Sequence, residues 1–339
     1  MNNNLLKRIF SMIFRFFPQC RIYGLSVAFW SVVFPLHHVF RFLKPFFGIK
    51  KHKAILNYLY KRYSDIINSL LTSNTTPLFN IEPESTIWVC WWDGEEQMPS
   101  LVKICYNSIL KYAGRHPVKF ISKYNYKNFI SIPDYIMEKV DKGIITITSF
   151  SDILRASLLY EYGGIWLDAT ILVLKDITLD NYHFFTLKAP GKSASVSLSR
   201  FSGIFNPSAR IINNKMLNAS RWSSFLLAGT KHSIIFEYIR NFYYAYWKDH
   251  NDQIDYMLVD FIIALGYDFI PNMKNAIDNV PCSPVEKFDM EKKLNNEYSD
   301  EYFKQFTETQ FHKLTWKNKF SSVTKNGKQT IYGYLLENS

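Results

Sequence analysis

Residues 151–173 read SDILRASLLYEYGGIWLDATILV, and this stretch decides the fold class. Apolar residues at helical spacing predict a helix over Ser151–Tyr162, which the pair Gly163-Gly164 ends. The near-continuous apolar run Ile165–Leu174 then predicts a buried strand. A helix that leads directly into such a strand is typical of an α/β domain with a mostly parallel sheet.

The same alternation extends on both sides of this stretch. Upstream, the sequence predicts strands over Thr86–Trp92, Val118–Ser122 and Ile144–Thr148 and a helix over Pro99–Tyr112. Downstream it predicts helices over Phe225–Trp247 and Tyr256–Leu265, then short strands and turns over Phe306–Leu336. We therefore expect one α/β domain over residues 84–339, with a mixed, mostly parallel sheet.

The chain carries a formal net charge of +11, and all of this excess lies in its first fifth. Residues 1–64 contain eleven Lys and Arg and no Asp or Glu, so the rest holds 29 basic and 29 acidic residues. A neutral body offers no basic groove, which argues against nucleic acid as a partner. The four cysteines include no C-x-x-C pair, so we expect neither a disulfide scaffold nor a structural zinc site.

The basic segment predicts a helical leader over residues 1–71. Over Asn4–Phe17 polar side chains recur every four positions and nearly all others are apolar, which predicts an amphipathic helix that ends at Pro18. The apolar stretch Gly24–Leu36 is too short to span a bilayer by itself. This composition favours a segment that associates with an anionic membrane surface. A helical hairpin docked on the body is the alternative.

Candidate functional residues lie within the opening stretch. Asp152 and Arg155 share one helix face, and Trp166, Asp168 and Thr170 alternate onto one side of the strand. Open α/β sheets bind ligands at the carboxyl ends of their strands, where these side chains project. A lone buried carboxylate such as Asp168 is costly unless it is paired or holds a metal. It either binds Mg²⁺ or Mn²⁺ with a diphosphate or forms an internal ion pair with Arg155, and the spacing alone slightly favours the ion pair.

The pattern S-D-h-x-R followed by G-G-h-a-h-D over Ser151–Asp168 resembles the sugar-binding DXD region of retaining glycosyltransferases. More specifically, it resembles the capsular polysaccharide synthesis group of glycosyltransferase family 32. Other blocks of that group are similar to Ile87–Pro99, Trp222–His232, Ile254–Leu265 and His312–Lys317. The resemblance implies a GT-A-like fold, which is a single Rossmann-type nucleotide-sugar domain.

The resemblance also implies which residues bind the donor. Trp92 matches the aromatic residue that stacks on the nucleotide base. Asp152 and Arg155 match the pair that hydrogen-bonds the donor ribose and sugar hydroxyls, and Asp168 matches the first Asp of the DXD motif. Trp166 stands where many relatives have an aromatic residue beside the sugar. Asp168 and Arg155 are accordingly the expected catalytic residues.

A divalent metal cofactor, Mn²⁺ or Mg²⁺, is implied as well, with Asp168 as a ligand. Thr170 occupies the place of the second DXD Asp, as in members of the group that read D-A-T. His312 is expected to complete the metal shell, and Lys313 or Lys317 is expected to meet the diphosphate.

The activity that the resemblance implies is that of a retaining glycosyltransferase. Such an enzyme moves a sugar from a nucleotide-sugar donor, here a UDP-hexose or UDP-N-acetylhexosamine, to a lipid-linked glycan acceptor of capsule or O-antigen type. The leader would place it peripherally at the cytoplasmic face of the inner membrane. Asp255 and Asp260 are candidates for orienting the acceptor, although a solvated helix face is the commoner role of such residues. The alternatives are a non-catalytic membrane-associated scaffold and a metal-dependent phosphotransferase or hydrolase that uses Asp168.

Overall fold

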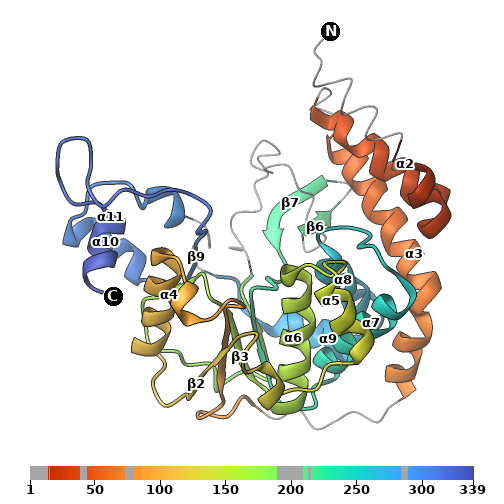
Figure 1. The fold of residues 1–339 in the computed structure, drawn as a ribbon, viewed down its shortest axis with the longest axis horizontal. Helices are drawn as coiled ribbons and strands as arrows, with labels where there is room; N and C mark the ends of the chain where they lie inside the picture. Colours follow the sequence, from red (N-terminus) through yellow and green to blue (C-terminus); the bar gives the residue numbers. More distant parts are fainter. Residues whose placement is uncertain are drawn as a thin grey trace.

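The structure, a computed structural model, describes residues 14, 16–38, 44–72, 80–188, 209–212, 215–283 and 289–339. At its centre lies a five-stranded sheet in the order β2-β1-β3-β8-β5 (Figure 1). Its strands are β1 (Ile87–Cys90), β2 (Val118–Ile121), β3 (Gly164–Asp168), β5 (Phe184–Thr186) and β8 (Leu226–Gly229). Strands β2, β1 and β3 run parallel, whereas β8 is antiparallel to β3 and to β5. The predicted mixed, mostly parallel α/β sheet is confirmed.

Helices and two small sheets surround this core. The described helices are α2 (Leu25–Val33), α3 (Lys44–Thr72), α4 (Ser100–Lys111), α5 (Asp134–Asp141), α6 (Ile147–Tyr162), α7 (Ile234–Asp249), α8 (Leu258–Phe269), α9 (Pro271–Asn279), α10 (Asp300–Thr307) and α11 (Ile331–Glu337). The small sheets pair β4 (Ile171–Val173) with β9 (Phe311–Lys313) and β6 (Ala209–Ile212) with β7 (Lys215–Ser220).

The central sheet is buried on both faces, because successive side chains of a strand point to opposite sides. Val89 and Leu167 pack into a core that includes α4. Trp88 and Trp166 pack into a larger core that includes α6, α7 and α8. The pairing of Cys90 with Asp168 brings the carboxyl ends of β1 and β3 level at one edge of the sheet.

The predicted strand over Ile144–Thr148 is wrong. Helix α6 begins at Ile147, and the side chain of Thr146 caps it by accepting a hydrogen bond of 3.2 Å from the backbone N–H of Ser149. The β-branched residues of this stretch fit a strand pattern, but the side-chain cap satisfies a helix terminus. The helix therefore begins four residues before the predicted start.

Two other predicted elements change character along their length. The predicted strand Ile165–Leu174 is two strands, since β3 ends at Asp168 and β4 leaves the main sheet to pair with β9. The predicted helix Phe225–Trp247 begins as strand β8 and becomes α7 only after the cap at Ser233. Short apolar runs fit a buried strand and a buried helix equally well, and tertiary pairing decides between them.

The N-terminal helix does not end at Pro18. Residues 16–23 are helical, so the predicted stop is wrong, and the break falls at Gly24, which has φ of +84°. A proline removes one helical hydrogen bond and bends a helix without having to end it. A residue with a positive φ cannot continue a right-handed helix, and glycine adopts such a φ most readily. The residues before Phe14 in the predicted amphipathic helix lie outside the described part of the chain.

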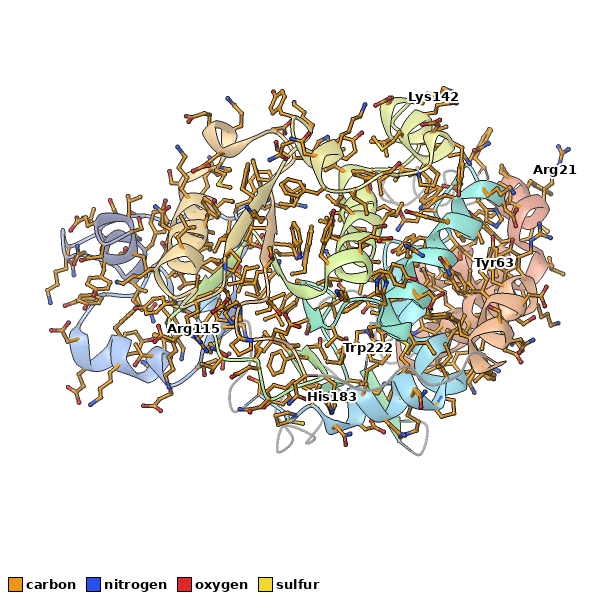
Figure 2. The ribbon with its side chains drawn as sticks, turned by 90° about the horizontal axis from the view of Figure 1, so that it is seen from below. Arg21, Tyr63, Arg115, Lys142, His183 and Trp222 are labelled. Carbon is orange, nitrogen blue, oxygen red and sulfur yellow. The ribbon has the colours of Figure 1, made fainter. Side chains whose placement is uncertain are left out.

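The N-terminal helices pack against the body, as in the docked hairpin that the sequence left as the alternative. Tyr23 and Val27 share a hydrophobic core with α7 and α8, as do Ile55 and Leu59 of α3. Figure 1 shows α2 and α3 side by side at one end of the molecule. Figure 2 shows Tyr63 on α3, where its ring packs against Phe242 of α7. Within the described ranges, no helix has both the length and the apolar character needed to cross a bilayer.

The turn between α6 and β3 requires glycine at both of its positions. Gly163 has φ of +68° and Gly164 has φ of +99°, a region that residues with a Cβ rarely adopt. A Cβ on Gly164 would lie 2.2 Å from the carbonyl oxygen of Thr86, which is backbone that cannot move aside. This close approach lets β3 enter the sheet beside β1.

We expect Gly164→Ala to lower the free energy of unfolding by about 3 kcal/mol or more, because strain and a backbone clash add. The matched control is Gly114→Ala, which has a φ of +61° but no atom within 4 Å of the added Cβ. It should lose only the conformational cost, about 1 kcal/mol. Urea unfolding of both variants measures the difference, and equal losses would show that the close approach at Gly164 is not required.

Candidate functional site

The guanidinium of Arg155 is the centre of the candidate site. It extends from α6, and only 4% of its side chain is exposed. Its Nη1 lies 3.0 Å from Oδ1 of Asp152 and also donates to the carbonyl of Ser224. Its Nη2 lies 3.1 Å from Oδ1 of Asp168. One buried cation therefore connects α6, the end of β3 and the segment before β8.

Asp168 is the last residue of β3, and three donors converge on its carboxylate. Oδ1 accepts from Arg155 and, at 2.9 Å, from the indole N–H of Trp166. Oδ2 accepts from the ammonium of Lys313 at 2.8 Å. Burial alone would raise the pKa of Asp168, but the charges of Lys313 and Arg155 outweigh it and hold the pKa below its usual value. The side chain is 28% exposed, so a ligand can approach it from solvent.

Lys313 reaches the site from the far end of the chain. It lies on β9, which pairs with β4 so that Lys313 stands opposite Ile171. Its ammonium lies 2.7 Å from the hydroxyl of Thr170 as well as 2.8 Å from Asp168. The structure thus brings Lys313 to the D-A-T turn. Lys317, the other predicted diphosphate ligand, is exposed.

Asp152 is buried on α6 and held from two sides. Arg155 meets one carboxylate oxygen, and the hydroxyl of Tyr243 donates to the other at 3.2 Å. Burial raises the pKa of Asp152 to about 6, against the opposing charge of Arg155 and with a smaller contribution from Asp168. At neutral pH the carboxylate is ionised and available to accept hydrogen bonds.

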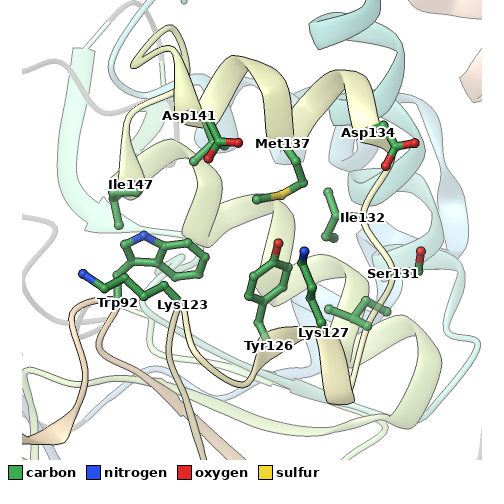
Figure 3. A pocket seen from close by; sticks show the side chains of 12 residues that line it. Trp92, Lys123, Tyr126, Lys127, Ser131, Ile132, Asp134, Met137, Asp141 and Ile147 are labelled. Atoms are coloured by element: carbon green, nitrogen blue, oxygen red, sulfur yellow. The ribbon is translucent and has the colours of Figure 1, made fainter.

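Trp92 lines a cavity of about 620 Å³ beyond the carboxyl ends of β1 and β2. Its ring packs against Tyr126 and Phe150 at centroid distances of 5.4 and 5.1 Å. Figure 3 shows Trp92 and Tyr126 on the floor of the cavity, with Lys127 beside Tyr126. Trp92 follows Cys90, which pairs with Asp168 of β3, so the cavity and the charged cluster lie at the same edge of the sheet, although no member of the cluster lines the cavity.

His312 does not join the predicted metal shell. It alternates with Lys313 along β9 and therefore points to the other side of the strand. There it is fully buried, and its Nε2 donates to the carbonyl of Phe306 at 3.0 Å. In the described part of the chain, no three His, Cys, Asp or Glu residues are grouped so that they could hold a metal ion. Both oxygens of Asp168 already accept from Arg155, Trp166 or Lys313, and a carboxylate held by these donors does not fit a divalent metal ion.

Three further predicted site residues make contacts within the protein that support the fold. Trp166 is only 1% exposed and supports Asp168 from within the core, so it does not line a sugar pocket as predicted. Asp255 pairs with Lys51 of α3 at 2.6 Å, which ties the N-terminal helices to the body. Asp260 is buried and accepts from the indole N–H of Trp222 at 2.9 Å, so an acceptor cannot contact it directly.

Sequence reasoning missed two tyrosines near the site. Tyr243 is fully buried against Asp152, but it lies in the aromatic run NFYYAYW, which indicates only a core helix. Tyr256 is 68% exposed. Burial and the charges of Asp152, Asp168 and Asp260 raise the pKa of Tyr256. No spacing pattern distinguishes it from other surface tyrosines.

The fold and the site together define an α/β protein of Rossmann-like layout, with charged side chains gathered at the carboxyl edge of its parallel strands. The chain belongs to the capsular polysaccharide synthesis protein family, whose sequence model matches residues 39–335. The predicted resemblance to that group is confirmed, and the matched region includes α3. A search of curated proteins finds no match to the chain.

Stability should depend on pH through Asp152. Its folded pKa of about 6 lies above the usual 3.8, so the folded protein keeps this proton over a range where the unfolded chain loses it. Stability from this group is therefore present below pH 4 and lost as pH rises toward 6. Asp152→Asn removes the titration, so its stability relative to the original protein should rise by about 2–3 kcal/mol across this window.

Urea unfolding at several pH values between 4 and 7 measures this difference. The control is Asp289→Asn, a half-exposed carboxylate that pairs only with Lys292 among the described ion pairs. A constant gap between Asp152→Asn and the original protein would contradict the raised pKa.

Proposed function

We propose that the protein is a retaining glycosyltransferase that moves a sugar from a nucleotide-sugar to a glycan acceptor in capsular polysaccharide synthesis. One observation carries the proposal: the buried guanidinium of Arg155 holds two carboxylates, Asp152 and Asp168, at the same edge of the sheet as Trp92 and its cavity. The family to which the chain belongs supports the same role. The finer assignment to glycosyltransferase family 32 is part of the proposal.

The donor would lie along this edge in an order that the residue types suggest. The cavity is roomy enough for a nucleoside, and the ring of Trp92 offers a stacking surface for the base. Asp152 and Arg155 come next and would hydrogen-bond the ribose and the sugar hydroxyls. Asp168 and Lys313 would then meet the sugar and the diphosphate. A UDP-hexose or a UDP-N-acetylhexosamine is the proposed donor.

The chemistry requires stabilisation of the leaving group. The acceptor oxygen forms a bond to the anomeric carbon while the bond from that carbon to the diphosphate oxygen breaks. The acceptor hydroxyl attacks from the face that the diphosphate leaves, and its proton passes to the departing phosphate oxygen, so configuration is retained. Negative charge develops on the diphosphate, and fixed cations such as Lys313 and Arg155 stabilise it.

Substitution of the central cluster tests the proposal. We expect Asp168→Asn and Arg155→Lys each to lower donor turnover by about 100-fold or more. Asp168→Asn removes the charge that holds Arg155 and Lys313 in place. In Arg155→Lys, a point charge does not replace the guanidinium fork. The assay measures hydrolysis or transfer with a panel of UDP-sugars, together with calorimetric donor binding. Arg240→Lys is the matched control. Arg240 forms an ion pair of 2.9 Å with Glu161, which is not part of the cluster.

Two results would count against a transferase. If the original protein binds and turns over no donor of the panel, the scaffold alternative is favoured. If Arg155→Lys retains full turnover, Arg155 serves only to join helix to strand.

We also propose that the protein attaches peripherally to the cytoplasmic face of the inner membrane, beside a lipid-linked acceptor. The support is a set of exposed apolar side chains on the N-terminal helices, named here the leader face. Its exposed apolar side chains are Phe14, Phe17, Ile22, Leu25, Phe29 and Phe46. Exposed Arg21, Lys50 and Lys53 lie on the same helices, and Figure 2 shows Arg21 at the outer edge of the molecule. Apolar burial and attraction to anionic lipids would act together.

Vesicle sedimentation tests this attachment. The triple variant Phe17→Ser/Leu25→Ser/Phe29→Ser should bind vesicles that contain anionic lipid at least about tenfold more weakly, because each apolar side chain contributes about 1 kcal/mol or more on insertion. Leu110→Ser is the control, since Leu110 is similarly exposed on α4. High salt should weaken but not abolish binding. Unchanged binding of the triple variant would exclude the leader face as the membrane contact.

A further inference from the structure

We propose that sugar transfer by this protein needs no divalent metal ion, because the ammonium of Lys313 binds the diphosphate instead of a metal. This inference rests on the proposed transferase function and concerns how the same site neutralises its leaving group. Its basis is the position of Lys313 between the first and third residues of the D-A-T turn.

The ammonium of Lys313 bridges the side chains of the first and third residues of the D-A-T turn. It is 2.8 Å from Oδ2 of Asp168 and 2.7 Å from the hydroxyl of Thr170. A carboxylate and a hydroxyl are good acceptors for an ammonium, which has three N–H donors. Two of them are used here, so one remains for an oxygen of the diphosphate.

The backbone fixes this lysine rather than leaving it on a flexible surface segment. Strand β9 pairs with β4, and the N–H of Leu314 donates to the carbonyl of Thr170 at 3.0 Å. The ammonium lies 4.9 Å from the ring centroid of Phe225, and 17% of the side chain is exposed. Lys313 is therefore held in one place and still accessible to a ligand.

The remaining ligand set disfavours a divalent ion at the same place. Mg²⁺ and Mn²⁺ prefer several oxygen ligands, and the second DXD carboxylate is replaced by the hydroxyl of Thr170. Both oxygens of Asp168 already accept from cationic or N–H donors, and Asp152 is held by Arg155. A dication bound to Asp168 would lie within a few ångströms of the Lys313 ammonium, and the two like charges would repel.

A lysine on β9 is suited to bind the diphosphate. An ammonium on a fixed strand carries one positive charge that needs no loading from solution. It meets one oxygen of the Asp168 carboxylate, and Arg155 meets the other. A diphosphate that displaces one of these contacts would exchange a carboxylate partner for a phosphate partner without leaving a buried charge unpaired.

Two independent measurements on the full-length protein test the inference. The first is Mn²⁺ binding to the free protein, followed by electron paramagnetic resonance or calorimetry. The second is turnover of the UDP-sugar panel in a chelator and in Mn²⁺. We expect the original protein to show no saturable Mn²⁺ binding and to retain its turnover in the chelator.

Designed variants make the comparison sharper. Lys313→Ala should lower turnover by about 100-fold, with no rescue by Mn²⁺. Thr170→Asp/Lys313→Ala supplies the second carboxylate and removes the ammonium, so it should gain saturable Mn²⁺ binding. Lys313→Arg keeps a cation and serves if Lys313→Ala fails to fold. Lys319→Ala, an exposed lysine on the following segment, is the control and should behave as the original protein.

The outcomes separate this inference from the proposed function. Turnover that is lost in the chelator and restored by Mn²⁺ would overturn the inference and leave the transferase intact. Saturable Mn²⁺ binding by the original protein, equal to that of the double variant, would also overturn it. Absence of donor binding and turnover under every condition would refute the transferase itself, whatever the Mn²⁺ measurements give.

Discussion

The site depends on one buried guanidinium. Arg155 lies between Asp152 and Asp168, and each carboxylate would be costly in the interior without it. Because its nitrogens also reach a backbone carbonyl before β8, the same side chain fixes the spacing of three elements. The pairing of opposite charges in a chain from Asp152 to Lys313 keeps the edge of the sheet close to neutral. A charged ligand can then approach without opposing a large local charge.

The sequence predicted the part of this arrangement that is local. Asp152, Arg155 and Asp168 lie within one helix, one turn and one strand, so their spacing determines that they meet. Strands β1 and β2 and helix α4 were also predicted close to their observed bounds, because Pro or Gly lies near their ends. The first two residues of α6, Ile147 and Thr148, were misread as the end of a strand since β-branched residues there fit both patterns.

What the sequence could not predict is long-range. The choice between Lys313 and Lys317, and the burial of His312, follow from the register of β9 against β4, which no local pattern encodes. The role of Tyr243 is concealed within an aromatic run that reads as core. The leader was predicted as amphipathic, but its docking depends on tertiary partners such as Asp255 and Tyr246, which lie more than 200 residues away along the chain. A helix can therefore be apolar on two sides, one for the core and one facing outward.

The D-A-T turn is the point where the chain leaves the main sheet, and the partner strand that it then meets is made 145 residues later, at Lys313. During synthesis from the N-terminus, the sheet edge, Arg155 and Asp168 emerge from the ribosome long before β9 does. Until then Asp168 has no second cation, and the site is incomplete. A nascent or C-terminally shortened chain that lacks β9 therefore also lacks the contact between Lys313 and Asp168.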